Sequence, residues 1–342
     1  MNVSSLTGGF FVDDFFPFSL TRSIADIRCG ILTIREKWNY YLQKYPSLPE
    51  TITFPANLLP DHELMESVTT GIKEPDLRKT TRLTDLTDIL RYNGVEIKKD
   101  FDLIMSGRQS LTISSTNRVT GTDIFLETGA EVEHCYLNAS EGPIYIGKNT
   151  LVMEGSMIRG PFAIGENSIV KMGAKIYGAT SAGPHCVLGG EIKNSVIFGY
   201  SNKAHDGYLG DSVIGEWCNL GAGSSNSNIK NSGGSVKLWN PIRKSFLDGG
   251  LKCGLMMGDY SRSAINTSFN TGTVIGPASH VFGIGLSPSY LPSFSWGYHG
   301  DVYNFEKALL HIGKWKNLKG YILNKEETEQ LKYIFDQQNQ VK

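Results

Sequence analysis

The sequence predicts a mainly β protein whose central part is a parallel β-helix. Six apolar residues stand six positions apart: Ile146, Val152, Ile158, Ile164, Val170 and Ile176. A helix face repeats about every 3.6 residues and a strand face about every two, so a period of six fits neither and is typical of hexapeptide coils. The chain also holds 38 glycines but only 13 prolines, which favours a fold with many tight corners.

The six-residue period returns further along the chain. It runs through Leu251, Met257, Ser263, Phe269, Ile275 and Val281, with Ser263 as its one polar member. In such a coil each sixth side chain points inward and stacks on its equivalent in the next coil, while small residues and Asn occupy the corners. We therefore expect the repeat region to cover residues 125–285.

The repeat loses its phase in two places. One is 177–213, and the other is 226–248, which contains Ser-Gly-Gly and Trp-Asn-Pro. Breaks in a solenoid usually map to loops on one face, often the binding face. A repeat that merely drifts would give the same pattern, so both interpretations remain open from the period alone.

Three segments are predicted along the chain. Residues 1–104 carry helical patterns over 24–42 and 83–92, whereas 105–285 show short β-branched runs with frequent Gly and Asn and form the β-helix.

Residues 286–342 are expected to cap the end of the coil. The stretch 286–296 is rich in Ser, Pro and aromatic residues and is expected to be an irregular cover. Residues 324–338 are expected to form a helix, with Glu326 and Glu327 in its first turn.

Composition excludes several classes of partner. With 33 basic and 34 acidic residues, the net charge of -1 argues against nucleic acid or an anionic membrane as the main partner. The scattered Cys29, Cys135, Cys186, Cys218 and Cys253 form no C-x-x-C pair, so buried thiols are expected rather than disulfides or a zinc site. No secretory signal and no stretch of membrane-spanning length is evident, so a cytoplasmic location is expected.

A dense polar set lies in the first break and just beyond it. It comprises Lys193-Asn194, the run 201–211 with His205 and Tyr208-Leu209-Gly210-Asp211, then Asn219-Leu220-Gly221-Ala222-Gly223, and Asn228. This set resembles the acetyltransferase domain of the bifunctional glucosamine-1-phosphate acetyltransferase/N-acetylglucosamine-1-phosphate uridyltransferase family, which reads approximately K-N, S-K-A-N-H-L-x-Y-L-G-D, N-I-G-A-G and C-N-Y.

The resemblance implies roles for the polar side chains. His205 would be the general base that removes a proton from an acceptor amine as the amine attacks the thioester of acetyl-CoA. Lys193 would hold a phosphate of the acceptor as a point charge. Tyr208, Asn219 and Asn228 would orient sugar hydroxyls or the amine, although Asn219 and Asn228 also suit corner positions of a coil.

The resemblance also implies a cofactor site and an assembly. Gly221, Ala222 and Gly223 would leave room for the pantetheine arm, and the Ala222 N–H could polarise the thioester carbonyl. The coil would be left-handed, and three chains would align as a homotrimer with acetyl-CoA in the groove between neighbours. The stretch 251–281 would form the wall beside the arm, and 146–176 would be spacer and trimer core.

The sequence departs from the family pattern on the acceptor side. No arginine corresponds to the phosphate-binding arginine upstream of Lys193, Ile229 replaces a tyrosine, and Asp206-Gly207 replaces a Leu-x pair. The acyl group and the acceptor sugar therefore stay open.

The N-terminal residues carry a second resemblance. Phe16 to Ile24 is similar to the P-L-T-x-x-R-P-K region of sugar nucleotidyltransferases, and much of the chain is similar to bacterial proteins that link this region to the same β-helix. This implies a reduced α/β nucleotidyltransferase-like domain over 1–104, in which Arg22, Asp26 and Arg28 could bind a nucleotide-sugar. A structural cluster of ion pairs is the alternative role for these three residues.

Three functions are consistent with these residues. The leading hypothesis is acyl transfer from acetyl-CoA to an amino sugar or its phosphate. The first alternative is a sugar-1-phosphate nucleotidyltransferase, which would need Mg²⁺. The second alternative is a non-enzymatic β-helix scaffold or ligand-binding protein. No metal-binding side chains are predicted, and the expected partners are a small sugar substrate and further copies of the chain.

Overall fold

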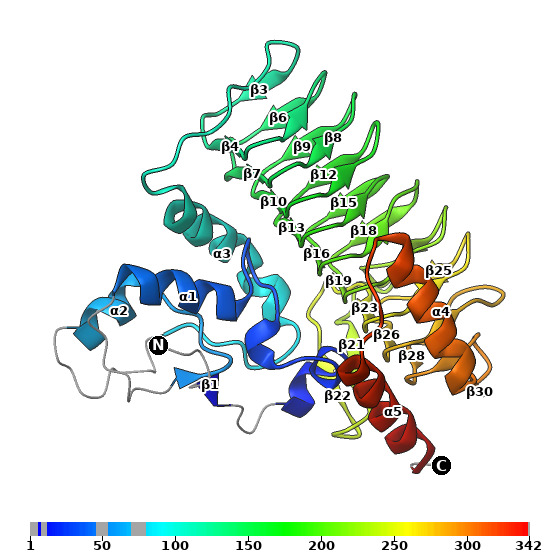
Figure 1. Cartoon of the computed structure of the whole chain (residues 1–342). Helices are drawn as coiled ribbons and strands as arrows, with labels where there is room; N and C mark the ends of the chain where they lie inside the picture. The colour runs from blue at the N-terminus through cyan, green and yellow to red at the C-terminus, as the bar shows by residue number, and fades with distance from the viewer. Residues whose placement is uncertain (1–5, 8–11, 46–53, 70–79, 341–342) are drawn as a thin grey trace.

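A solenoid of short parallel strands dominates the protein (Figure 1). The computed structural model describes residues 6–7, 12–45, 54–69 and 80–340. The described solenoid strands fall on three sides of a left-handed β-helix, named here sides A, B and C. The predicted fold class is therefore confirmed.

Side A is one continuous parallel sheet. Its strands are β4 (Ile124–Leu126), β7 (Ile144–Ile146), β10 (Phe162–Ile164), β13 (Thr180–Ala182), β16 (Val196–Ile197), β19 (Val213–Ile214), β23 (Met256–Met257), β26 (Val274–Ile275) and β28 (Tyr290–Leu291).

Sides B and C follow side A along each coil. Side B holds β5 (Glu131–Val132), β8 (Leu151–Val152), β11 (Ile169–Val170), β14 (Val187–Leu188), β17 (Asn202–Lys203), the single bridge residue Asn219, β24 (Arg262–Ser263), β27 (His280–Val281) and β29 (Ser295–Trp296), which pairs with β30 (Asp301–Val302). Side C holds β3 (Arg118–Thr120), β6 (Tyr136–Asn138), β9 (Met157–Arg159), β12 (Lys175–Tyr177), β15 (Glu191–Lys193), β18 (Tyr208–Gly210), β20 (Ser225–Asn226) and β25 (Ser268–Phe269).

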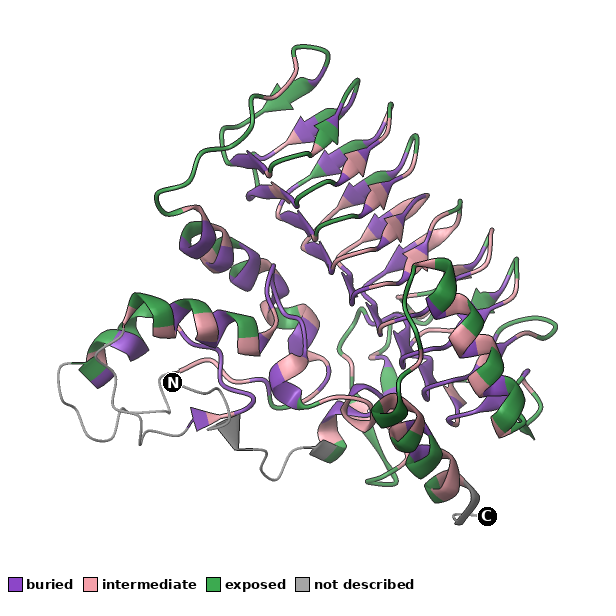
Figure 2. Cartoon of the chain, in the orientation of Figure 1, coloured by how far each residue is buried: buried purple, intermediate pink, exposed green. Residues whose placement is uncertain are grey.

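The residues of the six-residue period form the inner core of the solenoid. The first six, Ile146 to Ile176, are each no more than 2 % exposed and belong to one apolar cluster. Met257, Ser263, Phe269, Ile275 and Val281 are buried as well. The prediction for Leu251 is wrong, because this side chain is 65 % exposed in the segment that leads back to the coil. Figure 2 shows that the exposed residues of the coils gather at their outer corners.

The phase break at 177–213 is a run of shortened coils. Ile144 pairs with Phe162 and Phe162 with Thr180, so a full coil takes 18 residues. In the next coil Ser181 pairs with Val196, only 15 residues later. The sheets continue across this region, so the drifting interpretation of the break is the correct one here.

Much of this shortening lies at the corner formed by Gly189 and Gly190. A Cβ atom on Gly190 would lie 2.6 Å from the carbonyl oxygen of His205, and one on Gly189 would collide with that of Ala204. Only glycine lets the two corners stack this closely. In the first break, the corner that carries His205 therefore packs directly on the corner formed by Gly189 and Gly190.

The break at 226–248 is a true excursion from the coil. Val213 pairs with Met256, 43 residues later, and the insertion contains an antiparallel hairpin of β21 (Lys237–Asn240) and β22 (Ser245–Asp248). At the tip of the hairpin, next to its turn, the Asn240 side chain donates to the carbonyl oxygen of Asp13 at 2.7 Å.

The N-terminal unit packs on side A (Figure 1). It contains β1 (Leu6–Thr7), β2 (Phe54–Pro55), the 3₁₀ turns η2 (Val12–Phe15), η3 (Phe18–Leu20) and η4 (Ile24–Asp26), and the helices α1 (Ile34–Lys44), α2 (His62–Thr69) and α3 (Asp88–Met105). Its apolar residues share one cluster with the outward side chains of Ala163, Val196, Val213 and Met256.

The predicted N-terminal helices exist with different limits. The pattern over 24–42 contains helix α1, but that helix begins at residue 34, because Thr33 and Glu36 form a reciprocal capping box there. The pattern over 83–92 marks the start of α3, which continues to Met105. The buried Lys37 of α1 pairs with Glu96 of α3 at 2.8 Å and thereby ties the two helices together.

The C-terminal segment differs from its prediction in two ways. Residues 286–296 are not an irregular cover, since β28 and β29 continue the coil by one more turn. Helix α4 (Phe305–Leu318) was not predicted and lies against side B, whereas the predicted terminal helix is confirmed as α5 (Lys325–Gln340). Within the described residues, no helix is both long and apolar enough to cross a membrane.

The cysteine prediction is confirmed on burial. Cys29, Cys135, Cys186, Cys218 and Cys253 all lie in described parts of the chain, and there each thiol is free and buried.

Candidate functional site

His205 lies on an exposed corner between side B and side C. The corner joins β17 to β18, and the side chain of His205 faces solvent. The preceding Lys203 points the opposite way, into the solenoid, where it is 2 % exposed. Its ammonium donates to the carbonyl oxygen of His205 at 2.6 Å and to that of Gly189 at 3.1 Å. The backbone that carries His205 is thus held from inside.

Lys203 was not among the residues predicted from the sequence. Its register partner on side B is Leu188, a core residue, so Lys203 occupies a position that the repeat reserves for apolar side chains. Burial lowers the pKa of its ammonium to about 8. Lys203 lies within the phase break at 177–213, so the six-residue period alone does not reveal its inward position.

Tyr208 and Asn228 are brought together on side C. The Asn228 amide donates to the Tyr208 hydroxyl at 3.1 Å and also to the carboxylate of Asp211. Asn194 donates to the second oxygen of that carboxylate at 2.7 Å. Burial, followed by the charges of Asp211 and Glu191, raises the pKa of the Tyr208 phenol, so this hydroxyl stays protonated at neutral pH.

Lys193 also lies on side C, in strand β15 of the preceding coil. It pairs with Gly210 in the sheet, and its ammonium lies 6.0 Å from the centre of the Tyr177 ring. Lys193, Tyr208 and Asn228 therefore line one stretch of side C, near its corner with side A.

The Gly221-Ala222-Gly223 corner lies one coil beyond the His205 corner. The two are joined directly, since the Gly223 N–H donates to the carbonyl oxygen of Asp206 at 3.1 Å. The Ala222 carbonyl accepts from Asn266 at 2.7 Å, while the Ala222 N–H donates no hydrogen bond within the described part of the chain. Close contact with Ala264 of the following coil requires glycine at position 221.

Asn219 lies apart from the other candidate residues. It sits on side B between Asn202 and Arg262, and its side-chain oxygen accepts from the Asn202 amide at 3.3 Å. Lys319, just after α4, donates to the Asn202 side chain at 3.0 Å. Asn219 thus belongs to a polar row between side B and α4.

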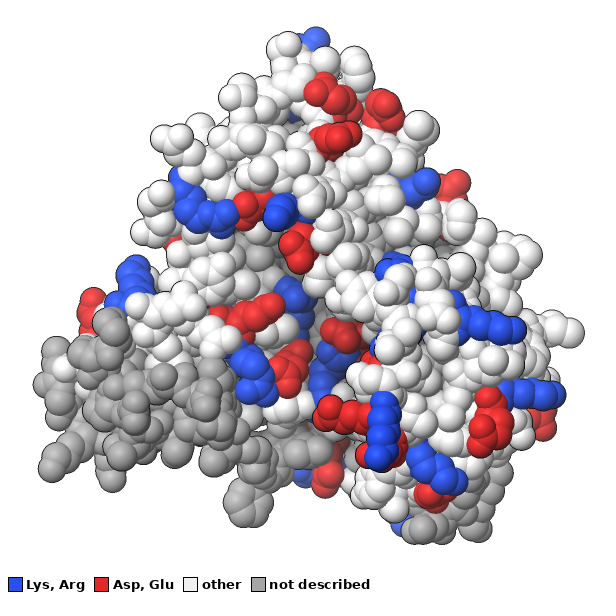
Figure 3. Space-filling view, viewed as in Figure 1, with Lys and Arg blue, Asp and Glu red and all other residues white. Residues whose placement is uncertain are grey.

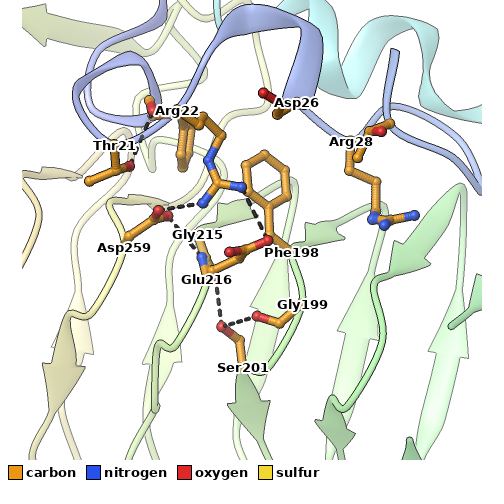
Figure 4. Close-up of polar contacts among 12 residues, drawn as sticks. Thr21, Arg22, Asp26, Arg28, Phe198, Gly199, Ser201, Gly215, Glu216 and Asp259 are labelled. Carbon is orange, nitrogen blue, oxygen red and sulfur yellow. Dashed lines mark hydrogen bonds and ion pairs between the residues drawn. The ribbon is translucent and has the colours of Figure 1, made fainter. Parts of the chain in front are cut away.

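Arg22 joins the N-terminal unit to the solenoid (Figure 4). Its guanidinium forms ion pairs with Asp259 and, at 3.2 Å, with Glu216, and lies 4.8 Å from the centre of the Phe198 ring. Burial lowers the pKa of this guanidinium, but the two carboxylates raise it more, so Arg22 stays charged.

Asp26 and Arg28 also have partners within the chain. Asp26 pairs with Arg35, and the Arg28 guanidinium donates to the carbonyl oxygen of Ile31 and lies 3.7 Å from the carboxylate of Glu36. Figure 3 shows acidic and basic side chains side by side over this face of the molecule.

A magnesium site is not evident from the side chains present. Among the described residues, no group of at least three His, Cys, Asp or Glu side chains is placed to hold a metal ion.

Comparisons with known proteins identify the relatives of the chain. Residues 9–57 match the family described as sugar nucleotidyl transferase. The bifunctional protein GlmU of Methanococcus maripaludis (strain S2) is 32% identical over 214 residues, which are 60% of this chain and 49% of that protein. The chain is similar to GlmU-like proteins.

Two further relatives support this similarity. The bifunctional sugar-1-phosphate nucleotidylyltransferase/acetyltransferase of Sulfurisphaera tokodaii is 36% identical over 92 residues, 27% of this chain and 23% of that protein. The GlmU of Methanocaldococcus jannaschii is 30% identical over 117 residues, 34% of this chain and 28% of that protein. The chain thus spans less than half the length of the curated relatives it matches, and the resemblance to GlmU-like proteins seen in the sequence is confirmed.

Proposed function

We propose that the protein transfers an acyl group from acetyl-CoA to the amine of an amino sugar or amino-sugar phosphate, with His205 as general base. One observation carries the proposal. The solvent-facing His205 corner is held from inside by Lys203 and stacks on the Gly221–Gly223 corner, whose Ala222 N–H has no acceptor among the described residues. A base and a hydrogen-bond donor on adjacent corners are the two groups that acyl transfer to an amine needs.

The chemistry assigns one task to each corner. The His205 imidazole accepts a proton from the acceptor ammonium or amine, and the amine nitrogen forms a bond to the thioester carbonyl carbon. The Ala222 N–H stabilises the negative charge that develops on the carbonyl oxygen. The C–S bond then breaks as the carbonyl re-forms, and the departing CoA thiolate takes the proton that the His205 imidazole accepted from the amine.

The polar residues of side C suit the acceptor. The Tyr208 hydroxyl and Asn228 amide form a fixed pair that can hydrogen-bond sugar hydroxyls, and Lys193 supplies a positive charge for a phosphate. Asn219 lies on side B, whereas Tyr208 and Asn228 lie on side C. Asn219 would therefore contact the acceptor only if the bound acceptor extended around the corner to side B.

Self-association through side C would complete the site. Tyr136 and Met157 point outward there and are 55 % and 50 % exposed, beside a groove of about 470 Å³ that extends to Tyr177. Apolar patches of this kind mark interaction surfaces. Met157→Glu should then reduce the mass of the assembly measured by light scattering. A wild-type protein with the mass of a monomer would contradict the homotrimer.

The test of the base is a pair of histidine variants. His205→Ala should lower acetyl-CoA turnover with glucosamine 1-phosphate by about 10²–10⁴-fold without changing the assembly state. His134→Ala is the matched control and should keep wild-type turnover, because His134 lies exposed on the equivalent corner between β5 and β6. Full turnover by the His205→Ala variant would refute the proposed mechanism. If the wild type shows no thermal shift with acetyl-CoA and no turnover, the non-enzymatic scaffold is favoured.

Nucleotidyl transfer is the second candidate, favoured by the family match over residues 9–57. The ion pairs of Arg22 and Asp26 weigh against it, since these side chains are already used within the chain. The activity predicts Mg²⁺-dependent release of pyrophosphate from a nucleoside triphosphate and a sugar 1-phosphate. No release across a broad panel of both substrates would exclude it.

A further inference from the structure

Arg262 is a buried cation without an anionic partner among the described residues. The residue is 8 % exposed, and its Nε and Nη2 atoms are buried with no hydrogen bond to any described group. The titratable groups that act on its guanidinium are the Cys218 thiol and the Tyr303 phenol, with no Asp or Glu among them in the described part of the chain. Burial lowers the pKa of Arg262 to about 10, so the side chain is still charged at neutral pH.

The neighbours of Arg262 do not neutralise it. Burial raises the pKa of the Cys218 thiol and of the Tyr303 phenol, so both groups are uncharged at neutral pH. Arg22 shows the contrast within the same molecule, because its buried guanidinium has two carboxylate partners. An isolated charge in a protein interior is costly, and an anion is the usual compensation.

The guanidinium lies between side B, where Arg262 is part of β24, and helix α4, which contributes Trp315. On side B it is flanked along the sheet by Asn219 and His280. From α4, the Trp315 ring stacks over it at 5.1 Å from the guanidinium carbon. Trp315 itself is half-buried, so part of its side chain reaches solvent.

Two histidines complete a cluster of nitrogen donors. His280 stands one strand beyond Arg262, and His311 stands one helical turn before Trp315 on α4. Both are half-buried, and Arg262 and His311 each contribute to the lowering of the His280 pKa, whose main cause is burial. His311 is oriented through Nδ1 by the hydroxyl of Tyr303.

We propose that Arg262, together with His280 and His311, binds a phosphate group between side B and α4. The guanidinium fork matches two oxygens of a tetrahedral oxyanion, and the remaining oxygens are free to accept from the imidazoles. A carboxylate would use the fork but would leave fewer acceptors for the histidines. The site lies on side B, away from His205, and does not depend on the proposed acyl transfer.

The direct test is phosphate binding by the full chain in phosphate-free buffer. Inorganic phosphate should raise the melting temperature of the wild type in a saturable way. The same titration with Arg262→Gln should show binding weakened by about tenfold or more, because the charge-assisted bonds are lost. Lys314→Gln is the matched control, since it removes the same charge from an exposed position of α4 and should leave binding unchanged.

The proposal is overturned if the wild type shows no saturable response to phosphate, or if Arg262→Gln responds as the wild type does. A second measurement does not depend on the stability of that variant. Imidazole resonances of His280 and His311 should shift on addition of phosphate to wild type, whereas resonances that stay in place would equally overturn the site.

The source of the phosphate group is distinguished by two further probes. Coenzyme A and glucosamine 1-phosphate each carry a phosphoryl group on a larger ligand. If either binds more tightly than inorganic phosphate and loses that advantage in Arg262→Gln, the site serves that ligand. If inorganic phosphate binds best, the site takes the free ion; both results support the site and differ only in its ligand.

Discussion

The ammonium of Lys203 donates to the main-chain carbonyl of His205 at 2.6 Å, so a charge inside the solenoid holds the corner that carries the proposed base. The same ammonium donates to the carbonyl oxygen of Gly189 on the neighbouring coil at 3.1 Å. One buried side chain therefore connects the shortened coil with the candidate site.

Lys203→Met is expected to lower acetyl-CoA turnover about tenfold or more, because the His205 backbone loses its internal anchor and the base moves away from the acceptor amine. Steady-state kinetics of the single and double variants check this. In a His205→Ala background the Lys203 change should have little further effect. If Lys203→Met lowered turnover equally in the wild type and in the His205→Ala variant, Lys203 would affect activity independently of His205.

Lys203 should also make stability depend on pH in the alkaline range. Burial lowers its pKa to about 8 in the folded protein, from 10.5 for a solvated lysine, so between these limits the unfolded chain binds more protons. Stability contributed by this group therefore rises with pH across the window, by up to about 3 kcal/mol. Urea denaturation at several pH values, for wild type and Lys203→Met, isolates the effect as a difference. Parallel stability curves for the two proteins would contradict it.

The fold was predictable where the period is local and apolar. Ile146 to Ile176 stack on their equivalents in neighbouring coils, and this burial alone produces the six-residue rhythm. The glycine pair at 189 and 190 could not be read as a shortened corner, because the deletion only shows once the sheets are paired. Helix α4 was missed because its buried face includes Lys316, which breaks an otherwise apolar stripe.

The sequence identified the residues of the candidate site but not the side of the solenoid on which each of them lies. Tyr208 and Asn228 meet on side C, whereas Asn219 of the same motif stands on side B, because each third of a coil turns the chain to a new side. Lys203 and Arg262 escaped notice since charged residues are rare at buried positions of a coil. Only the three-dimensional pairing shows that one points inward and the other lies under α4.

Gly207→Ala should disrupt the corner next to His205. Gly207 has a φ of +117°, and a Cβ atom there would collide with the carbonyl oxygen of Ser224. We expect a loss of at least about 2 kcal/mol in the free energy of unfolding, together with loss of activity. Gly233→Ala is the control, since its φ is also positive but a Cβ atom meets no described atom within 4 Å. Similar stability losses for the two variants, measured by urea denaturation, would contradict the predicted clash.

The last prediction separates the two roles open to Arg22. If it is a structural clasp, Arg22→Met leaves Asp259 buried without its cation and should cost about 3–5 kcal/mol in unfolding free energy. The double variant with Asp259→Asn should recover part of that loss, because the unpaired charge is gone. Arg35→Met, which breaks a half-exposed pair with Asp26, should cost less than about 1 kcal/mol.

A nucleotide-sugar site would give the opposite result for the same variants. Arg22→Met would then leave the free energy of unfolding near that of wild type and abolish binding of a nucleotide-sugar in calorimetry. Because the Arg22 guanidinium is already paired with Asp259 and Glu216 in the folded chain, we expect the first outcome. The N-terminal unit would then act as a covering layer that is locked to the coil.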